Sequence, residues 1–281
     1  MLEIGETGIK IREVQKTQLE ILLEFDRICK KHNIIYQLFA GTLLGSIRHK
    51  GFIPWDDDID VCLLRDDYER FLEVCNKDLD NKYFLQTYAS DPNYIMQFAK
   101  LRKNNTVFLE KVTANCDIHH GVYIDIFPLD YVRPSTFAGK LQQKLLYCVG
   151  RVNLTRIRNL CTKTDSKLQR SLRLAAYYFM KVIPRGLTNG AQNRLCTIFK
   201  KNSDKMMLVS HLTNGASDIR LKKYMMKESD FHVIIEGEFE GYKFPIPQNY
   251  DEVLRNLFGN YKELPPVEAR KPHHGIIKIQ L

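Results

Sequence analysis

The chain has 281 residues, of which 44% are hydrophobic and 27% charged, and its formal net charge is +9. This balance predicts a globular protein and argues against a disordered one. No stretch approaches 18 consecutive apolar residues, the first residues lack a signal-peptide pattern, and none of the seven cysteines forms a C-x-x-C pair, so we expect a cytoplasmic protein whose reduced cysteines all serve in packing.

The first third of the chain alternates helical and strand patterns. Apolar residues between 14 and 31 have helical spacing, and the apolar run 34–40 predicts a strand. A short helix is expected at 42–48, before a loop whose glycine and proline exclude regular structure. A second strand is predicted at 59–64, and Asp67 is expected to cap the helix that follows it.

Further apolar runs predict four more strands, at 83–86, 95–101, 106–110 and 122–127. Asp130, just beyond the last of them, is expected in a turn. Alternation of this kind predicts an α/β (α+β) fold with a mixed sheet and flanking helices.

The segment from about 136 to 205 changes to basic amphipathic helices, which we expect to be broken at Pro184, Gly186 and Gly190. Between 136 and 230 there are 19 lysines and arginines against 5 acidic residues, so this segment carries the whole positive excess. It is suited to a polyanion or to an anionic membrane surface, with a solvated helical surface as the alternative. No motif indicates nucleic-acid binding, and no nucleic-acid partner is expected.

The last part of the chain is predicted to contain a turn at Gly237, short extended pieces over 241–247 and a helix at 250–258 that Gly259 closes. The polar segment at 262–275 is expected to be irregular.

The first candidate site is the acidic run of Asp56, Asp57, Asp58 and Asp60 at the start of the second predicted strand. Asp58 and Asp60 are two residues apart, so their side chains point to the same face of a strand. Such close like charges repel unless a divalent cation lies between them, and oxygen-only ligands favour magnesium or manganese. An acidic loop or a calcium site is the alternative, but the EF-hand spacing is absent.

Asp125 lies in an otherwise apolar strand between Ile124 and Ile126. An unpaired buried carboxylate is costly, so Asp125 is a candidate third ligand of the same metal. A buried salt bridge or a hydrogen-bonded structural aspartate is the alternative.

Upstream, the string GTLLGSIR supplies two glycines, a helix start and a cation that suit a phosphate. Together with the acids, as G-T-x(n)-D-x-D, it resembles the nucleotidyltransferase superfamily. The longer string ICKKHNIIYQLFAGTLLGSIRHKGFIPWDDDIDV resembles the signature of the LicD family of phosphocholine transferases. The resemblance continues through FAKLRKNNTVF, GVYIDIFPLD, FEGYKFPIPQNYDEVLRNLFGNYKELPP and a final histidine pair.

The resemblance covers most of the chain except the basic middle. It implies a nucleotidyltransferase-like catalytic core at 1–135, an inserted basic helical segment at 136–225, and a part at 226–281 that completes the catalytic domain. It also implies transfer of phosphocholine from CDP-choline to a sugar hydroxyl of a cell-surface glycan or teichoic acid precursor, lipid-linked, with release of CMP.

Carried to this sequence, the resemblance makes Asp58, Asp60 and Asp125 the catalytic acids and the ligands of Mg²⁺ or Mn²⁺. We expect Asp125 to be the general base as well. The substrate-binding candidates are Gly41, Thr42 and Gly45 in the phosphate turn, with Arg48, Trp55, Lys100, Arg102, His273 and His274. A choline group needs an aromatic cage, and the nearest aromatics along the chain are Trp55, Tyr36, Tyr94 and Tyr123.

Three alternatives stay open at this point. The first is transfer of another phospho-alcohol, such as ribitol phosphate or glycerol phosphate, from its CDP conjugate. The second is transfer of a nucleotidyl group with release of pyrophosphate. A noncatalytic glycan- or membrane-binding protein is the third. Peripheral attachment of the basic segment to the inner face of the cell membrane is compatible with all three.

Overall fold

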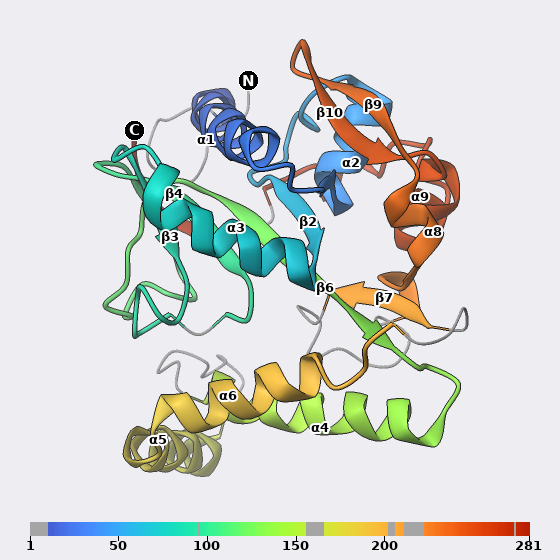
Figure 1. Cartoon of the computed structure of the whole chain (residues 1–281). Coiled ribbons are helices and arrows are strands. Elements are labelled where there is room, and N and C mark those ends of the chain that lie inside the picture. Colours follow the sequence, from blue (N-terminus) through green and yellow to red (C-terminus); the bar gives the residue numbers. More distant parts are fainter. Residues whose placement is uncertain (1–10, 95, 156–165, 202–205, 211–221, 273) are drawn as a thin grey trace.

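A curled mixed sheet of seven strands organises the protein, whose computed structural model describes residues 11–94, 96–155, 166–201, 206–210, 222–272 and 274–281 (Figure 1). The strand order is β1 (Gln37–Leu38), β2 (Asp60–Leu64), β6 (Tyr123–Val132), β4 (Ala99–Lys103) and β3 (Tyr83–Gln86). Beyond this path β7 (Met207–Ser210) pairs with β6, and β8 (Met226–Lys227) pairs with β7. Only β2 and β6 are parallel among these pairs. The expected mixed α/β fold is confirmed.

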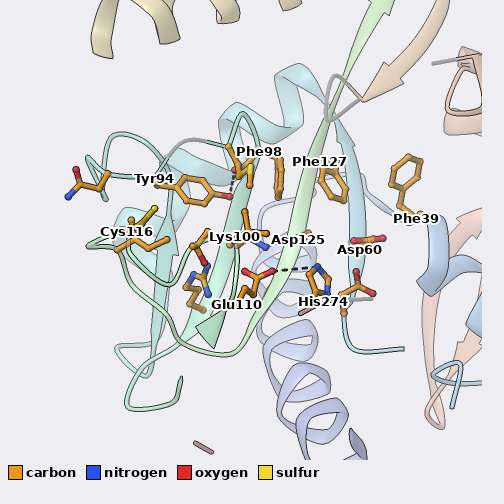
Figure 2. A pocket seen from close by; sticks show the side chains of 18 of the residues that line it. Phe39, Asp60, Tyr94, Phe98, Lys100, Glu110, Cys116, Asp125, Phe127 and His274 are labelled. Atoms are coloured by element: carbon orange, nitrogen blue, oxygen red, sulfur yellow. Dashed lines mark hydrogen bonds and ion pairs between the residues drawn. The ribbon is translucent and has the colours of Figure 1, made fainter. Parts of the chain in front are cut away.

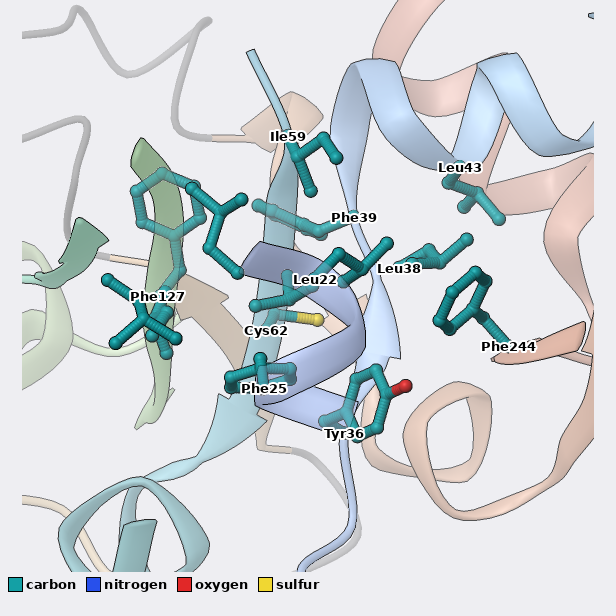
Figure 3. Close-up of a cluster of buried hydrophobic side chains, with 14 of the residues drawn as sticks. Leu22, Phe25, Tyr36, Leu38, Phe39, Leu43, Ile59, Cys62, Phe127 and Phe244 are labelled. Carbon is teal, nitrogen blue, oxygen red and sulfur yellow. The ribbon is translucent and has the colours of Figure 1, made fainter. Parts of the chain in front are cut away.

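Helices α1 (Ile11–Lys31) and α3 (Arg65–Asp78) pack against each other and against the central strands. The helical spacing of apolar residues in α1 places Leu22, Phe25 and Ile28 in one buried stripe. Figure 3 shows Leu22 and Phe25 beside Cys62 of β2 and Phe127 of β6. Each large apolar side chain buried in this way contributes about 1.5–3 kcal/mol, so this cluster fixes β2 and β6 side by side.

Helix α2 (Ala40–His49) follows β1 and lies against the hairpin of β9 (Ile234–Phe239) and β10 (Tyr242–Pro247) and against α9 (Tyr250–Phe258). Ser46 donates a 2.8 Å hydrogen bond to the carbonyl of Glu238. A Cβ on Gly237 would lie 2.8 Å from Ser46 Oγ, so the glycine permits this close approach. The expectation of a turn at Gly237 is wrong, because Gly237 lies inside β9 and the chain turns at Glu240 and Gly241, both with positive φ.

The C-terminal residues form an unexpected strand, β11 (Ile276–Gln280), which pairs antiparallel with β5 (Val107–Glu110). The sequence predicts no strand there, because the segment offers only five residues after the irregular tail at 262–275. The pairing partner 170 residues upstream supplies the hydrogen bonds that make it a strand. This pairing brings His274 back to the first third of the chain.

The basic segment contains α4 (Phe137–Leu154), α5 (Lys167–Val182) and α6 (Arg185–Cys196), which lie apart from the sheet in Figure 1. Pro184 separates α5 from α6 as expected, but Gly186 and Gly190 lie inside α6 and do not break it. Strand β7 comes from within 136–225 and joins the main sheet, and the division of the chain into three parts stays a prediction. None of the described helices is long and apolar enough to cross a membrane.

Two further residues differ from expectation. Asp67 does not cap α3, because the helix begins at Arg65 and Leu64 is its N-cap. Asp130 is not in a turn: it is buried in β6, where the guanidinium of Arg65 binds both of its carboxylate oxygens at 2.8 and 2.5 Å. The strand predicted at 122–127 therefore extends to Val132, because Arg65 pairs with the carboxylate of Asp130 within it.

The six cysteines in the described part of the chain are free thiols. Four of them, Cys29, Cys62, Cys75 and Cys196, are buried as packing residues, but Cys148 is exposed on α4, so the expectation that all cysteines pack in the core is wrong there.

Candidate active site

Three consecutive aspartates in the loop before β2 bring their carboxylates together. Oxygens of Asp56, Asp57 and Asp58 lie within 4.8 Å of one another, the spacing needed for a shared metal ion. Asp56 and Asp57 are buried, whereas Asp58 is partly exposed. Gln15 and Gln18 of α1 bind the loop by donating hydrogen bonds to the backbone carbonyls of Asp56 and Asp57, at 2.9 and 2.7 Å.

Asp60 and Asp125 face each other across the parallel pair β2 and β6, in direct register. The next strand, β4, places Lys100 in register with Asp125, and the Lys100 amine donates to the Asp125 carboxylate at 2.6 Å. The order β2, β6, β4 therefore places an acid, a second acid and a cation side by side. The buried salt bridge that we weighed for Asp125 is present, and Asp125 still lies beside Asp60.

The crowding of buried acids disfavours their charged forms. Burial, then the charges of Asp58 and Asp57, raise the pKa of Asp56 to about 8. Burial and the charges of Asp58 and Asp125 raise the pKa of Asp60 well above its usual value. Burial also raises the pKa of Asp125, although Lys100 opposes this shift. Oxygen ligands that repel one another in this way fit a divalent cation such as Mg²⁺ or Mn²⁺, because the cation would relieve the repulsion.

The start of α2 faces the acids. Thr42 Oγ1 accepts a 2.8 Å hydrogen bond from the backbone N–H of Asp60, which fixes the helix to β2. A Cβ on Gly41 would lie 2.9 Å from a carboxylate oxygen of Asp56, and one on Gly45 would lie 2.5 Å from the carbonyl oxygen of Gly51. Both glycines of the predicted phosphate turn are thus required for close approach. The N-terminus of α2, which these glycines adjoin, can bind an anion.

His274 binds the aspartate loop from the C-terminal end of the chain. Its ring Nδ1 lies 3.1 Å from one carboxylate oxygen of Asp57, and its backbone N–H donates to the other at 3.1 Å. Its Nε2 lies 3.6 Å from Glu110 of β5. Burial lowers the pKa of His274, but the hydrogen bond to Asp57 and nearby acids outweigh burial and raise it to about 9. His273 lies outside the described residues.

Two cavities meet at the acids. The first has a volume of about 350 Å³ and lies on the β4 and β5 side. Figure 2 shows Tyr94, Phe98 and Phe127 along one part of its wall, with Lys100, Glu110, Asp125 and His274 beside the acids. The second cavity has a volume of about 750 Å³ and is lined by α2, the loop before β2 and the residues after α9. Asp58 and Asp60 line both cavities.

Lys100 and Arg102, predicted on one strand face, both line the first cavity. The Lys100 amine lies 3.3 Å from the centre of the Tyr123 ring, in addition to its bond with Asp125. Arg102 is almost fully buried, and it donates to Gln86 at 2.5 Å and to the carbonyl of Gly121 at 2.6 Å. Burial lowers its pKa.

Arg48 and Trp55, the other two substrate-binding candidates, line the second cavity. Arg48 donates a 2.8 Å hydrogen bond to the carbonyl of Tyr261. The guanidinium of Arg270 lies 5.6 Å from the centre of the Trp55 ring, and His49 meets that ring edge-on.

The sequence predicted Asp56 and Asp57 as part of the acidic run at the catalytic centre but gave neither a separate role, and it did not indicate Glu110. Nothing local marks Glu110, because its place depends on the pairing of β5 with β11.

The sequence of the chain is similar to those of known proteins. Residues 33–144 match the family described as LicD/FKTN/FKRP, nucleotidyltransferase domain. Over 276 residues the chain is 33% identical to the lipopolysaccharide cholinephosphotransferase LicD of Haemophilus influenzae, covering 95% of this chain and 96% of the relative. An uncharacterized protein of Rickettsia prowazekii is 30% identical over 92 residues, which cover 26% of this chain and 32% of that protein.

Proposed function

The chain belongs to the LicD family, and on that basis we propose that it transfers phosphocholine from CDP-choline to a sugar hydroxyl of a cell-surface glycan or teichoic acid precursor. The H. influenzae relative is named for choline phosphate transfer to lipopolysaccharide. The observation that carries the proposal is the pair of cavities that meet at Asp58 and Asp60, since a transferase must hold two substrates against one reacting centre.

Asp58, Asp60 and Asp125 are the proposed ligands of Mg²⁺ or Mn²⁺, and Asp56 and Asp57 have carboxylate oxygens within 4.8 Å of one from Asp58. The bound cation would neutralise the oxygens of the donor's two phosphates. The raised pKa values of Asp56 and Asp60 support this assignment. They show that burial and mutual repulsion disfavour the charged carboxylates, and a bound cation would relieve both effects.

The reaction breaks the P–O bond between the two phosphates of the donor and forms a P–O bond to the sugar. CMP leaves with the electron pair, and the proton of the sugar hydroxyl passes to Asp125. Lys100 supports this role, because its 2.6 Å bond keeps the Asp125 carboxylate in place and favours its charged form. The N-terminus of α2, with Gly41 and Thr42, is suited to the phosphates.

We assign the choline group to the first cavity. A quaternary ammonium is attracted to aromatic faces and to carboxylates, and this cavity offers Tyr94, Phe98 and Phe127 together with Glu110. Trp55 is a weaker candidate for the cage, because the Arg270 guanidinium already lies over its ring. Tyr36 cannot take part, because it is buried in the core and donates to Asp26.

The test of the reaction uses a panel of donors: CDP-choline, CDP-ribitol, CDP-glycerol and CTP, each with Mg²⁺ and with or without a candidate glycan. We expect CMP from CDP-choline and no pyrophosphate from CTP. Preference for CDP-ribitol or CDP-glycerol would contradict the choline assignment, and pyrophosphate release would point to nucleotidyl transfer.

The test of the cage uses a matched pair at Tyr94, whose hydroxyl donates to the carbonyl of Phe98 at 3.0 Å. Tyr94→Phe keeps the ring and removes only that hydrogen bond, whereas Tyr94→Leu removes the ring. A cation–π contact of about 1–2 kcal/mol predicts that KM for CDP-choline rises roughly 10-fold in Tyr94→Leu and little in Tyr94→Phe, with inhibition by CMP unchanged. Equal KM values in both variants would place choline elsewhere.

A further inference from the structure

Helix α4 buries polar residues and exposes apolar ones. Its inward stripe contains Gln142, which donates to the carbonyl of Leu195 at 2.8 Å, and Asn153, which donates to Gln192 of α6 at 2.6 Å. Side-chain hydrogen bonds therefore take part in holding α4 to α6. A surface helix of a globular protein usually has the opposite pattern, with apolar residues toward the protein and polar residues toward water.

The outward face of α4 carries an apolar stripe at helical spacing, formed by Phe137, Leu141, Leu145, Cys148 and Val152. Phe137 is 83% exposed. A second stripe, of Lys140, Lys144 and Arg151, runs beside the first on the same outward side. Apolar side chains and cations thus share the surface of one helix.

Helix α5 also exposes an apolar stripe. Leu168, Leu172, Phe179 and Val182 lie on one stripe and are 61–80% exposed. Lys167, Arg170 and Arg173 lie outside that stripe, and the helix contains no acidic residue. Between 136 and 201 the sequence has 14 lysines and arginines and one acidic residue.

We propose that the exposed apolar stripes of α4 and α5, with Lys140, Lys144 and Arg151 beside the first of them, called here the docking face, bind the headgroup region of an anionic lipid bilayer. Amphipathic helices with cations beside a leucine and phenylalanine stripe lie in that region, where apolar side chains enter the acyl boundary and cations meet anionic headgroups. The charge decides between occupants. A second copy of the chain would place the same positive face against itself, which is unfavourable, whereas an anionic bilayer complements it.

The docking face is connected to the first cavity. Arg185, the first residue of α6, donates a hydrogen bond to the carbonyl of Pro92. Asn93 and Tyr94, which follow Pro92 in the chain, line that cavity. This contact links the basic helices to the wall of the proposed reaction site. This inference extends the proposed function, since it explains how a lipid-linked acceptor would be presented.

The experiment is flotation of the full chain with vesicles of phosphatidylcholine alone or with 30 mol% phosphatidylglycerol, at low and high salt. The test variant is Leu172→Asp with Phe179→Asp, and a second variant is Lys140→Gln with Lys144→Gln. The control is Tyr242→Asp, because Tyr242 is also an exposed aromatic but lies on the β9–β10 hairpin. CMP release from CDP-choline with a soluble candidate glycan, without vesicles, is measured for each.

We expect wild type and Tyr242→Asp to float with anionic vesicles and to be released by salt, since salt screens the charge contacts. Both double variants should bind at least 10-fold more weakly, with CMP release unchanged. Equal binding of wild type and the Leu172 and Phe179 variant, or equal binding to neutral and anionic vesicles, would overturn the proposal. Absence of vesicle binding, with a dimer that the double aspartate variant disrupts, would assign the face to self-association. If wild type itself released no CMP, that result would instead contradict the proposed function.

Discussion

At the scale of single residues, the acids of the site combine roles that their sequence positions only partly reveal. The spacing of Asp58 and Asp60 and the apolar neighbours of Asp125 predicted a cluster, and Asp60 and Asp125 do lie in register. The same pattern left Asp57 without a role. Its bonds to His274 join positions 217 residues apart, and no local pattern can predict such a contact.

Replacing Asp58 by Asn should separate metal binding from stability. The substitution removes one negative charge from the cluster of carboxylates that contains Asp56. We therefore expect the affinity for Mg²⁺, measured by calorimetry, to fall at least 10-fold. The metal-free variant should also unfold about 2–4 °C higher, because about 1 kcal/mol of repulsion is removed. Unchanged metal affinity would contradict the assignment of Asp58 as a ligand.

The pair of Arg12 and Glu240 should make stability depend on pH. The hydrogen bond from Arg12 outweighs burial and lowers the pKa of Glu240 below its usual 4.5. The folded state therefore holds the proton less tightly than the unfolded state does, so this stabilisation is present above about pH 4.5 and is lost as the pH falls through the lowered value.

Glu240→Gln should accordingly reduce the free energy of unfolding by about 0.5–1.5 kcal/mol at pH 7, a modest effect because Arg12 is partly exposed. The difference from wild type should shrink as the pH falls below 4.5. Urea unfolding at both pH values measures it. The matched control is Glu236→Gln on the same hairpin, whose pair with Lys243 is exposed and should matter little. A difference that persists at low pH would show that the charge of Glu240 is not its source.

At the scale of elements, local patterns predicted α1, α9 and β3 well, because apolar periodicity and a closing glycine suffice for such elements. They failed for β11 and for the continuation of β6 through Asp130. The first depends on pairing with β5, and the second on the salt bridge with Arg65. The expected strand at 34–40 shrinks to Gln37–Leu38, because only these residues pair with β2.

Two glycines in different helices should respond oppositely to alanine. A methyl group on Gly45 of α2 would meet the Gly51 carbonyl at 2.5 Å, so Gly45→Ala should destabilise the protein by about 1–3 kcal/mol. Gly190 of α6 has no atom within 4 Å of such a methyl, so Gly190→Ala should stabilise it by about 0.5–1 kcal/mol. Thermal unfolding distinguishes the two. A stable Gly45→Ala variant would show that α2 can move away from the loop.

At the scale of the whole molecule, the mixed sheet places two cavities against one group of acids, and a separate layer of basic helices lies beside them (Figure 1). The sequence predicted the mixed α/β fold and the basic segment. It could not predict two cavities, since their walls come from strands, loops and the C-terminal part together. Nor could it predict that α4 buries Gln142 and Asn153, because helical periodicity alone does not tell which stripe faces the protein.

The most direct test of the central claim uses CDP-choline with tritium in the cytosine and radiocarbon in the choline, incubated with Mg²⁺ and a lipopolysaccharide or teichoic acid precursor lacking choline. We predict that the acceptor gains radiocarbon but no tritium, with one tritiated CMP released for each choline transferred. Asp125→Asn should slow this transfer about 100-fold or more while donor binding is retained, because a general base acts in the transition state. Tritium in the acceptor, or CMP release from CDP-ribitol but not from CDP-choline, would contradict the account.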